Sequence, residues 1–389
     1  MSQSPIYFDY AATTPVDERV AAKMVQFLTR EGQYGNPASR SHLLGWLAEE
    51  AVEDARNEIA DLIGADNREI VWTSGATESN NLALKGVAEN FAPDDCHLIV
   101  SATEHKAVLD PALYLQKRGY GLTILKPDSD GVISVDAVKN ALQPNTRLVS
   151  LMAANNETGV LNPVAKIGAL LAERGVWFHI DAAQAVGKIP VDVNEWQATL
   201  LSISGHKFYA PKGVGALYVR RRSTLELRAQ IHGGGHERGM RSGTLATHQL
   251  VAIGAAANIA KTEMADEAAR IQTLRDRLWS GIEDLGDIRI NGAGAPRTPG
   301  HLNVAFGGID GEALMMALRN LAVSTGSACT SASVEPSHVL KAMGLADSVA
   351  HGSLRFSLGR YTTQSDVDQA IASIREAVPA LRKQSSVAS

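Results

Sequence analysis

The chain has 389 residues, of which 45% are hydrophobic and 20% are charged, and it carries a formal net charge of −5. This is the composition of a folded globular protein, and the length exceeds that of one ordinary core, so we expect two domains. The small negative charge gives no basis for binding nucleic acid, and no apolar run is long enough to span a membrane.

Two cysteines occur in the chain, Cys96 and Cys329. So few cysteines indicate a reducing compartment, and we expect a cytoplasmic protein in which a cysteine has a chemical rather than a structural role. Cys96 precedes an apolar run at residues 98–100 and is predicted to be buried. Cys329 lies in the small, polar run STGSACTSAS at residues 324–333, which favours exposure and a reactive thiol.

Helical and strand-like patterns alternate through the first half of the chain. A helix is expected at about residues 16–29. A second helix is expected to follow Ser39 as its N-cap, with apolar residues from Leu43 to Ile63 on one broad face and Gly64 as its stop. Apolar strand-like runs follow at residues 70–72, 98–100, 122–125, 148–152, 176–180 and 199–203, with helical patterns between most of them. This alternation predicts an α/β fold with a mostly parallel sheet between two layers of helices.

The rhythm changes after about residue 245. A long, alanine-rich helical pattern covers residues 246–285, and shorter strand-like runs follow at 288–290, 301–305, 321–324 and 354–357, with helical patterns between them. These shorter elements are typical of a smaller α+β domain. We therefore predict a large domain at residues 16–260 and a small domain formed by residues 1–15 and 261–389.

Small and hydroxylated residues follow the first strand of the predicted sheet. Gly75 and Thr77 stand at the start of a helix, where free backbone N–H groups can bind an anion such as phosphate. A plain helix N-cap is the alternative interpretation. The segment lacks the lysine spacing of a nucleotide-binding P-loop, so that class of site is not supported.

A carboxylate and a lysine follow two later strands. Asp181 ends the run at 176–180, and a buried carboxylate there needs a positive or proton-donating partner. Lys207 lies 26 positions later, where an apolar environment disfavours its ammonium form and leaves a nucleophilic amine. A helix-capping aspartate and a surface lysine are the alternatives. Taken together with His105 and Asn156 at the same sheet edge, these residues describe a site for an aromatic, cationic, phosphorylated aldehyde cofactor.

The ordered set of motifs strongly resembles the pyridoxal-phosphate-dependent cysteine desulfurases of the iron–sulfur cluster assembly and nitrogen-fixation type. The matching segments are YFDYAATT at 7–14, YGNPAS at 34–39, TSGATESN at 73–80, EH at 104–105, NNE at 155–157, DAAQ at 181–184, SGHK at 204–207, RSGT at 241–244 and LRFS at 354–357. This resemblance implies the aspartate-aminotransferase-like fold (fold type I), in which a seven-stranded, mostly parallel sheet forms the large domain.

The resemblance also implies a role for each cofactor-binding residue. Lys207 would hold the cofactor and act as a base, Asp181 would pair with the ring nitrogen, and His105 would stack on the ring and assist proton transfer. Asn156 and Gln184 would bind the ring hydroxyl. The phosphate would be bound by Ala76, Thr77, Ser204 and His206. Thr244 would reach the phosphate of a neighbouring subunit, so a homodimer is implied. No metal site is expected.

For the substrate side, the resemblance implies Arg355 as the clamp for a carboxylate, with Asn36 nearby, because a planar guanidinium matches a carboxylate in a bidentate manner. Cys329 would take sulfur from L-cysteine as a persulfide, leaving L-alanine, and would lie in the long mobile loop of one family branch. The sulfur would pass to iron–sulfur cluster assembly or to another acceptor. Many relatives continue with a C-terminal tail that engages the cluster scaffold, whereas this sequence stops soon after Lys383. The resemblance therefore does not fix which protein accepts the sulfur.

Other interpretations of the same residues are weaker. The pattern S-x-x-K at residues 204–207 occurs in serine acyl-enzymes, but the companion S-D-N and K-T-G motifs are missing. The glycine-rich run between His232 and His236 could be a metal or oxyanion site, although a flexible dimer-contact loop fits it better. A selenocysteine lyase, an aminotransferase and a protein that mainly delivers sulfur are the closer rivals.

Overall fold

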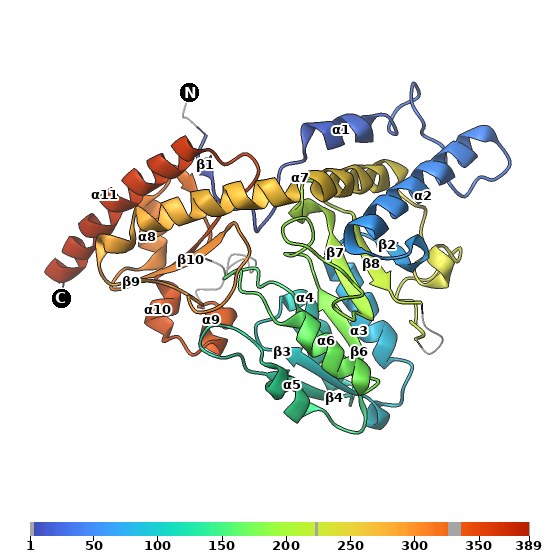
Figure 1. The fold of residues 1–389 in the computed structure, drawn as a ribbon, viewed down its shortest axis with the longest axis horizontal. Helices are drawn as coiled ribbons and strands as arrows, with labels where there is room; N and C mark the ends of the chain where they lie inside the picture. Colours follow the sequence, from blue (N-terminus) through green and yellow to red (C-terminus); the bar gives the residue numbers. More distant parts are fainter. Residues whose placement is uncertain (1–3, 222–224, 326–335, 389) are drawn as a thin grey trace.

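The computed structural model of the chain describes residues 4–221, 225–325 and 336–388, so Cys329 lies outside the described residues. Two bodies of secondary structure are joined by one long helix, α7 (Thr247–Ser280), which crosses the upper half of Figure 1. The observed helix agrees with the predicted helical region at 246–285.

The larger body is built on a seven-stranded sheet. Its order is β2 (Ile70–Thr73), β8 (Gly215–Val219), β7 (Leu200–Ser204), β6 (Trp177–Asp181), β5 (Thr146–Met152), β3 (His97–Ser101) and β4 (Gly121–Leu125). Only β8 runs antiparallel to its neighbours, while the other pairings are parallel. The prediction of a mostly parallel seven-stranded sheet is therefore confirmed.

Side chains along a strand alternate between the two faces of the sheet, so these continuously apolar strands present apolar side chains on both faces. Helices cover both faces and bury these side chains. Leu98 and Val100 of β3 pack with α3 (Ala76–Ala88) and α4 (Lys106–Lys117). Ile99, between them, packs into the opposite core with residues of α2 (Leu43–Ile63) and α6 (Val164–Glu173). The short helices α1 (Glu18–Val25) and α5 (Val135–Ala141) complete the larger body.

The smaller body contains an antiparallel sheet of β12 (Ser353–Ser357), β10 (His301–Phe306) and β9 (Ile288–Ile290). Its helices are α8 (Gly311–Ala317), α9 (His338–Ala342), α10 (Asp347–His351) and α11 (Gln364–Ala388). The N-terminal strand β1 (Ile6–Tyr7) pairs in parallel with β11 (Leu321–Ala322) and so joins this part of the chain.

Helix α7 contributes to two separate cores. Leu250 and Ile253 belong to the core of the larger body, whereas Leu274 and Leu278 pack with Phe8 and the smaller sheet. This division supports the predicted two-domain organisation, although the boundaries at 15/16 and 260/261 stay a prediction.

Two local expectations need adjustment. Helix α1 is shorter than the predicted 16–29, because it ends at Val25. The N-cap of α2 is His42 rather than Ser39, since the His42 imidazole accepts a hydrogen bond from the Gly45 backbone N–H at 3.2 Å. The stop at Gly64 is confirmed by its left-handed backbone, with φ of 70°.

Within the described ranges, no helix is both long and apolar enough to cross a membrane. Among the same residues, no group of three or more His, Cys, Asp and Glu side chains is arranged to hold a metal ion.

Candidate active site

A cavity of about 570 Å³ lies at the carboxyl ends of the parallel strands, where open α/β sheets generally bind ligands. Its walls include ten of the residues singled out from the sequence: Ala76, Thr77, His105, Asn156, Asp181, Gln184, Ser204, His206, Lys207 and Arg355. Nine of the ten come from the larger body, and Arg355 comes from β12 of the smaller one. The cavity therefore lies where the two bodies meet.

One end of the cavity is suited to an anion. Helix α3 begins there at Gly75, whose φ is 147° and which makes no side-chain cap hydrogen bond. A Cβ atom on Gly215 of β8 would lie 2.6 Å from the Gly75 Cα, so only glycine allows these two backbones to approach. The N–H groups of the first helical turn, with Thr77, Ser204 and His206, provide the donors that a phosphate group requires.

Asp181, the last residue of β6, places a buried carboxylate in the cavity wall. Its Oδ2 accepts a hydrogen bond from Asn80 Nδ2 at 2.7 Å, and its Oδ1 accepts one from the Ala183 N–H at 3.0 Å. Both of these donors are neutral. A cationic ring nitrogen would give this carboxylate the positive partner that its burial calls for.

The amine of Lys207 is held by the N-terminal segment. Lys207 follows β7 in a short 3-10 turn, and its Nζ donates to the backbone carbonyls of Ala11 and Ala12 at 2.7 Å each. The Gln184 amide also donates to the Ala11 carbonyl, at 2.9 Å, and its Oε1 accepts from Lys188 Nζ at 2.5 Å. Burial lowers the pKa of Lys188 to about 7, and the charges of Lys207 and Arg355 act in the same direction.

Both histidines in the cavity have lowered pKa values. Burial is the main cause for each, and it brings the pKa of His206 to about 4, with Lys207 as the next contribution. Neutral imidazoles are therefore favoured at pH 7. The Nδ1 atom of His105 accepts a hydrogen bond from the Ala107 N–H at 3.0 Å, which leaves the ring hydrogen on Nε2.

Arg355 is almost fully buried, with 3% of its surface exposed. Its Nη1 donates to the Asn156 carbonyl at 2.7 Å and its Nη2 to Asp9 Oδ1 at 2.6 Å. Its buried Nε has no hydrogen-bond partner among the described residues, and neither does the buried Oδ1 of Asn156. Since buried polar atoms are nearly always hydrogen-bonded, these two atoms are placed to receive a ligand.

Three predicted site residues are not brought to this cavity by the described part of the chain. Asn36 and Thr244 are exposed and lie outside its lining, and Asn36 Oδ1 accepts a hydrogen bond from the Ala38 N–H within its own turn. Cys329 is outside the described residues. The other cysteine, Cys96, is buried, and burial raises the pKa of its thiol to about 11.

Sequence reasoning overlooked the residues that support the expected ones. Asn80 was part of a matched motif but had no assigned role, although a polar residue on the buried face of α3 is itself a signal for a partner. The carbonyls of Ala11 and Ala12 have no comparable signal, because a backbone atom looks the same at every position.

The chain is similar in sequence to proteins of a known family. The profile of the family described as aminotransferase class-V matches residues 6–370. The chain belongs to this family. Its relatives include the cysteine desulfurase IscS of Shewanella sp. (strain MR-4), which is 58% identical over 381 residues, covering 98% of this chain and 94% of the relative. The IscS of Shewanella oneidensis is 57% identical over the same share of both chains.

Solved structures show the same resemblance. A NifS-like protein superimposes with a TM-score of 0.89 at 37% identity, covering 97% of this chain and 100% of the other. The protein SspA, solved in complex with cysteine, gives a TM-score of 0.81 at 38% identity, covering 92% of this chain and 100% of SspA. The class-V member described here therefore has fold type I.

The family depends on pyridoxal 5′-phosphate, and the cavity fits that group. The uncapped start of α3 suits the phosphate, and the buried carboxylate of Asp181 suits the ring nitrogen. The orphan Oδ1 of Asn156 leaves a polar atom for the ring substituents, and the Lys207 amine lies in the same wall. Each part of the cofactor thus has a chemically matched residue.

Proposed function

We propose that this chain is a cysteine desulfurase, which converts L-cysteine to L-alanine and transfers the sulfur to Cys329 as a persulfide. The relatives named cysteine desulfurase, and the SspA structure with cysteine, support this activity. The observation that carries the proposal is the meeting of Lys207, Asp181 and Arg355 in one cavity at the junction of the two bodies.

Arg355 would bind the substrate carboxylate. Its Nη atoms donate to the Asn156 carbonyl and to Asp9, which fixes the plane of the guanidinium. Its Nε–H has no hydrogen-bond partner in the part of the chain that the structure describes. A planar, pre-oriented cation of this kind holds a carboxylate in one orientation. The α-carbon of the bound cysteine is thereby directed toward the Lys207 side of the cavity.

Lys207 would move the α-proton. When bound, pyridoxal 5′-phosphate supplies an electron-withdrawing ring that stabilises negative charge on the substrate α-carbon. Asp181 keeps the ring nitrogen positively charged, and this role agrees with its burial and its two neutral hydrogen-bond donors. His105, held by the Ala107 N–H, presents its Nε2–H as a proton donor in the same space.

Cys329 would accept the sulfur. Its thiolate attacks the sulfur of cysteine, the carbon–sulfur bond of the substrate breaks as the sulfur–sulfur bond forms, and protonation of the remaining carbon gives alanine. The overall change converts one thiol and one cysteine into one persulfide and one alanine, so no external oxidant is needed. The buried, high-pKa thiol of Cys96 is unsuited to this step, because the thiolate is the reactive form.

The active form would be a homodimer. An exposed apolar group lies around the start of α2. Each of its members has 40–62% of its surface exposed: Tyr34, Leu43, Leu44 and Trp46. Such a group supports a protein contact there. The exposure of Thr244 agrees with the proposal that it completes the phosphate site of a second copy. We further propose a cytoplasmic location and sulfur delivery to iron–sulfur cluster assembly or another protein acceptor.

The test is a single-turnover reaction of the purified, cofactor-loaded protein with L-cysteine and no acceptor. We expect one alanine for each persulfide, with the added sulfur located on Cys329 by peptide mass spectrometry. A requirement for a keto acid, with 3-mercaptopyruvate formed in place of alanine, would instead indicate an aminotransferase. A strong preference for selenocysteine, with negligible turnover of cysteine, would indicate a selenocysteine lyase.

A further inference from the structure

Tyr209 lies two positions after Lys207 and has a left-handed backbone, with φ of 69°. This conformation is uncommon for any residue with a side chain and is strained for a bulky one. Strain of this kind persists only where the surroundings determine the conformation, and it is concentrated near functional sites. The contacts that hold Tyr209 are therefore informative.

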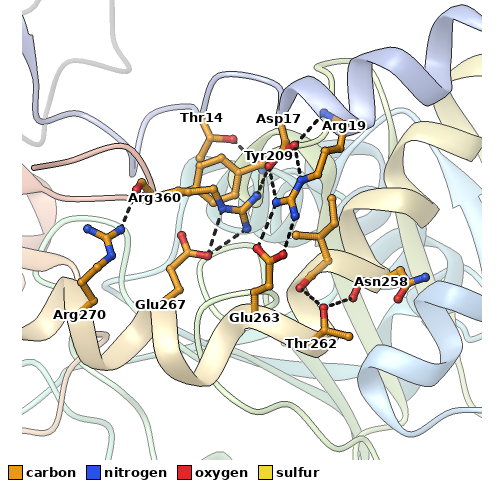
Figure 2. Close-up of polar contacts among 11 residues, drawn as sticks. Thr14, Asp17, Arg19, Tyr209, Asn258, Thr262, Glu263, Glu267, Arg270 and Arg360 are labelled. Atoms are coloured by element: carbon orange, nitrogen blue, oxygen red, sulfur yellow. Dashed lines mark hydrogen bonds and ion pairs between the residues drawn. The ribbon is translucent and has the colours of Figure 1, made fainter.

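Two segments that are distant in the sequence contact the backbone, the hydroxyl and the ring of Tyr209 (Figure 2). Its backbone N–H donates to Thr14 Oγ1 at 2.8 Å, and its carbonyl accepts from the Asp17 N–H at 3.1 Å. Its hydroxyl accepts from the Arg360 backbone N–H at 2.6 Å, and the Arg360 guanidinium lies 4.1 Å from the ring centroid. The N-terminal segment thus fixes its backbone, and Arg360 fixes its side chain.

Arg360 is itself fixed by carboxylates on two other segments. Its Nη1 donates to Asp17 Oδ2 at 2.6 Å, and its Nε and Nη2 donate to Glu267 Oε2 of α7 at 3.2 and 3.0 Å. These three side chains are largely shielded, with 13% or less of each exposed. Arg270 of α7 also donates to the Arg360 carbonyl at 2.7 Å. Three segments far apart in the sequence, represented by Asp17, Tyr209 and Glu267, therefore converge on one guanidinium (Figure 2).

The same segments carry the residues that face the substrate. Arg360 follows β12, which bears Arg355 five positions earlier. The N-terminal segment supplies the Ala11 and Ala12 carbonyls that hold the Lys207 amine, and its Thr14 N–H donates to the His206 carbonyl at 2.9 Å. Arg360 and Tyr209 thus connect the strand that bears Arg355 with the turn that carries Lys207, in addition to the direct Arg355–Asp9 ion pair.

We propose that Arg360 is a positioning residue for the proposed reaction. Arg360 is not part of the cavity lining among the described residues. By clamping Tyr209 and Asp17, it sets the separation between the carboxylate-binding Arg355 and the amine of Lys207. This inference rests on the proposed function, because it assigns Arg355 and Lys207 to the two ends of one substrate.

The simpler interpretation is a structural ion-pair network at the domain junction, and Arg19 is the matched control for it. Arg19 binds the same Asp17 carboxylate, with Nη2–Oδ2 at 2.9 Å and Nε–Oδ1 at 3.0 Å, and it also binds Glu263 of α7. No contact in Figure 2 joins Arg19 to Tyr209 or to Arg360. Replacing Arg19 with methionine therefore removes ion pairs to the same Asp17 carboxylate and to α7, although Arg19 is more exposed, at 53% against 13% for Arg360, and it leaves the contacts between Arg360 and Tyr209 in place.

The experiment compares the cofactor-loaded wild type with Arg360→Met, Arg360→Lys and Arg19→Met. For each protein, the affinities for pyridoxal phosphate and for L-alanine are measured from the cofactor absorbance, together with KM and kcat for cysteine. We expect Arg360→Met to weaken L-alanine binding and raise KM by about tenfold, with cofactor affinity changed much less. Arg360→Lys, which keeps the charge but loses the planar fork, should recover part of this effect, and Arg19→Met should leave both values near those of the wild type.

Equal effects of Arg360→Met and Arg19→Met on L-alanine affinity, or no effect of either, would overturn the inference. If Arg360→Met does not fold, Tyr209→Phe takes its place, since it removes only the hydroxyl that accepts from the Arg360 N–H. Unchanged L-alanine affinity in both Tyr209→Phe and Arg360→Lys would then overturn the positioning role. A wild-type protein that binds no pyridoxal phosphate would contradict the proposed function instead, so the two failures are distinguishable.

Discussion

Arg355 and Asp9 form an ion pair with an Nη2–Oδ1 distance of 2.6 Å, which joins β12 to the N-terminal segment in the wall of the cavity. The pair uses one edge of the guanidinium and leaves the buried Nε without a partner among the described residues. Asp9 therefore orients the cation without satisfying all of it, as a substrate clamp requires. This arrangement leads directly to the first prediction.

Arg355→Lys should weaken substrate binding while the cofactor stays in place. Lysine keeps the positive charge but cannot donate to Asn156, Asp9 and a carboxylate in one plane. The lost charge-assisted hydrogen bonding is worth about 1.5–3 kcal/mol, which corresponds to a rise in KM for cysteine of about 10- to 100-fold. Steady-state kinetics with parallel absorbance spectra check this, and a normal KM would remove Arg355 from the substrate site.

Asp181→Asn should loosen the cofactor. The substitution keeps the hydrogen-bonding shape of the side chain but removes the charge that would pair with the ring nitrogen. Loss of one buried charge-assisted contact of about 1.5–3 kcal/mol predicts pyridoxal phosphate affinity lower by about 10- to 100-fold, as measured by absorbance titration. Asn80→Ser is the control, because it removes only the neutral donor to Asp181 Oδ2. An effect of Asn80→Ser as large as that of Asp181→Asn would contradict the role given to the charge.

Cys329→Ser should abolish persulfide formation and leave cofactor absorbance intact, whereas Cys96→Ser should preserve both. The contrast follows from the environment of Cys96, whose burial raises the pKa of the thiol to about 11 and suppresses the thiolate. Sulfane sulfur bound per chain after one turnover is the measurement. Persulfide in Cys329→Ser at the wild-type rate would move the acceptor role to another group.

The sequence predicted the elements that depend on local pattern. The strand-like runs correspond to observed strands because both faces of the sheet are buried, which makes these strands continuously apolar. The site loops were found because polar residues follow buried strands, a position where they need a partner. Together with the residues that the family resemblance added, among them Gln184 and Arg355, ten of the predicted site residues line one cavity.

The sequence could not predict features that arise from contacts between distant segments. The carbonyls of Ala11 and Ala12 reach Lys207 across nearly 200 positions, and backbone atoms leave no residue-type signature. The left-handed Tyr209 is equally hidden, because tertiary contacts rather than local preference impose its φ. The expected Ser39 cap was wrong because an imidazole, which is less common at N-caps, accepts the Gly45 N–H instead.

His179 should make the protein more stable as pH rises toward neutrality. It lies buried between Ser150 and Ser202, with ring nitrogen to hydroxyl distances of 2.7 and 2.9 Å, and burial lowers its pKa to about 3. Between that value and its usual pKa, the unfolded chain binds the extra proton, so the unfolding free energy increases with pH. We expect about 2 kcal/mol from this residue between pH 4.5 and pH 7.

Urea unfolding of the cofactor-free protein at these two pH values, compared with His179→Gln, isolates this contribution. The variant should have a lower unfolding free energy at both pH values. The difference in its unfolding free energy between pH 4.5 and pH 7 should be smaller than that of the wild type by about 2 kcal/mol. An identical difference between the two pH values in both proteins would show that His179 is not held neutral in the native state.

The central claim is that Lys207 is the residue that holds pyridoxal phosphate. Lys188 is the informative rival, because its pKa of about 7 also favours a neutral amine and it is hydrogen-bonded to Gln184 in the same region. The most direct measurement is borohydride reduction of the cofactor-loaded protein, followed by digestion and peptide mass mapping. We expect the reduced cofactor on Lys207, and we expect the Lys207→Ala variant to carry no reduced cofactor on any lysine. Attachment to Lys188, or to no lysine, would contradict it.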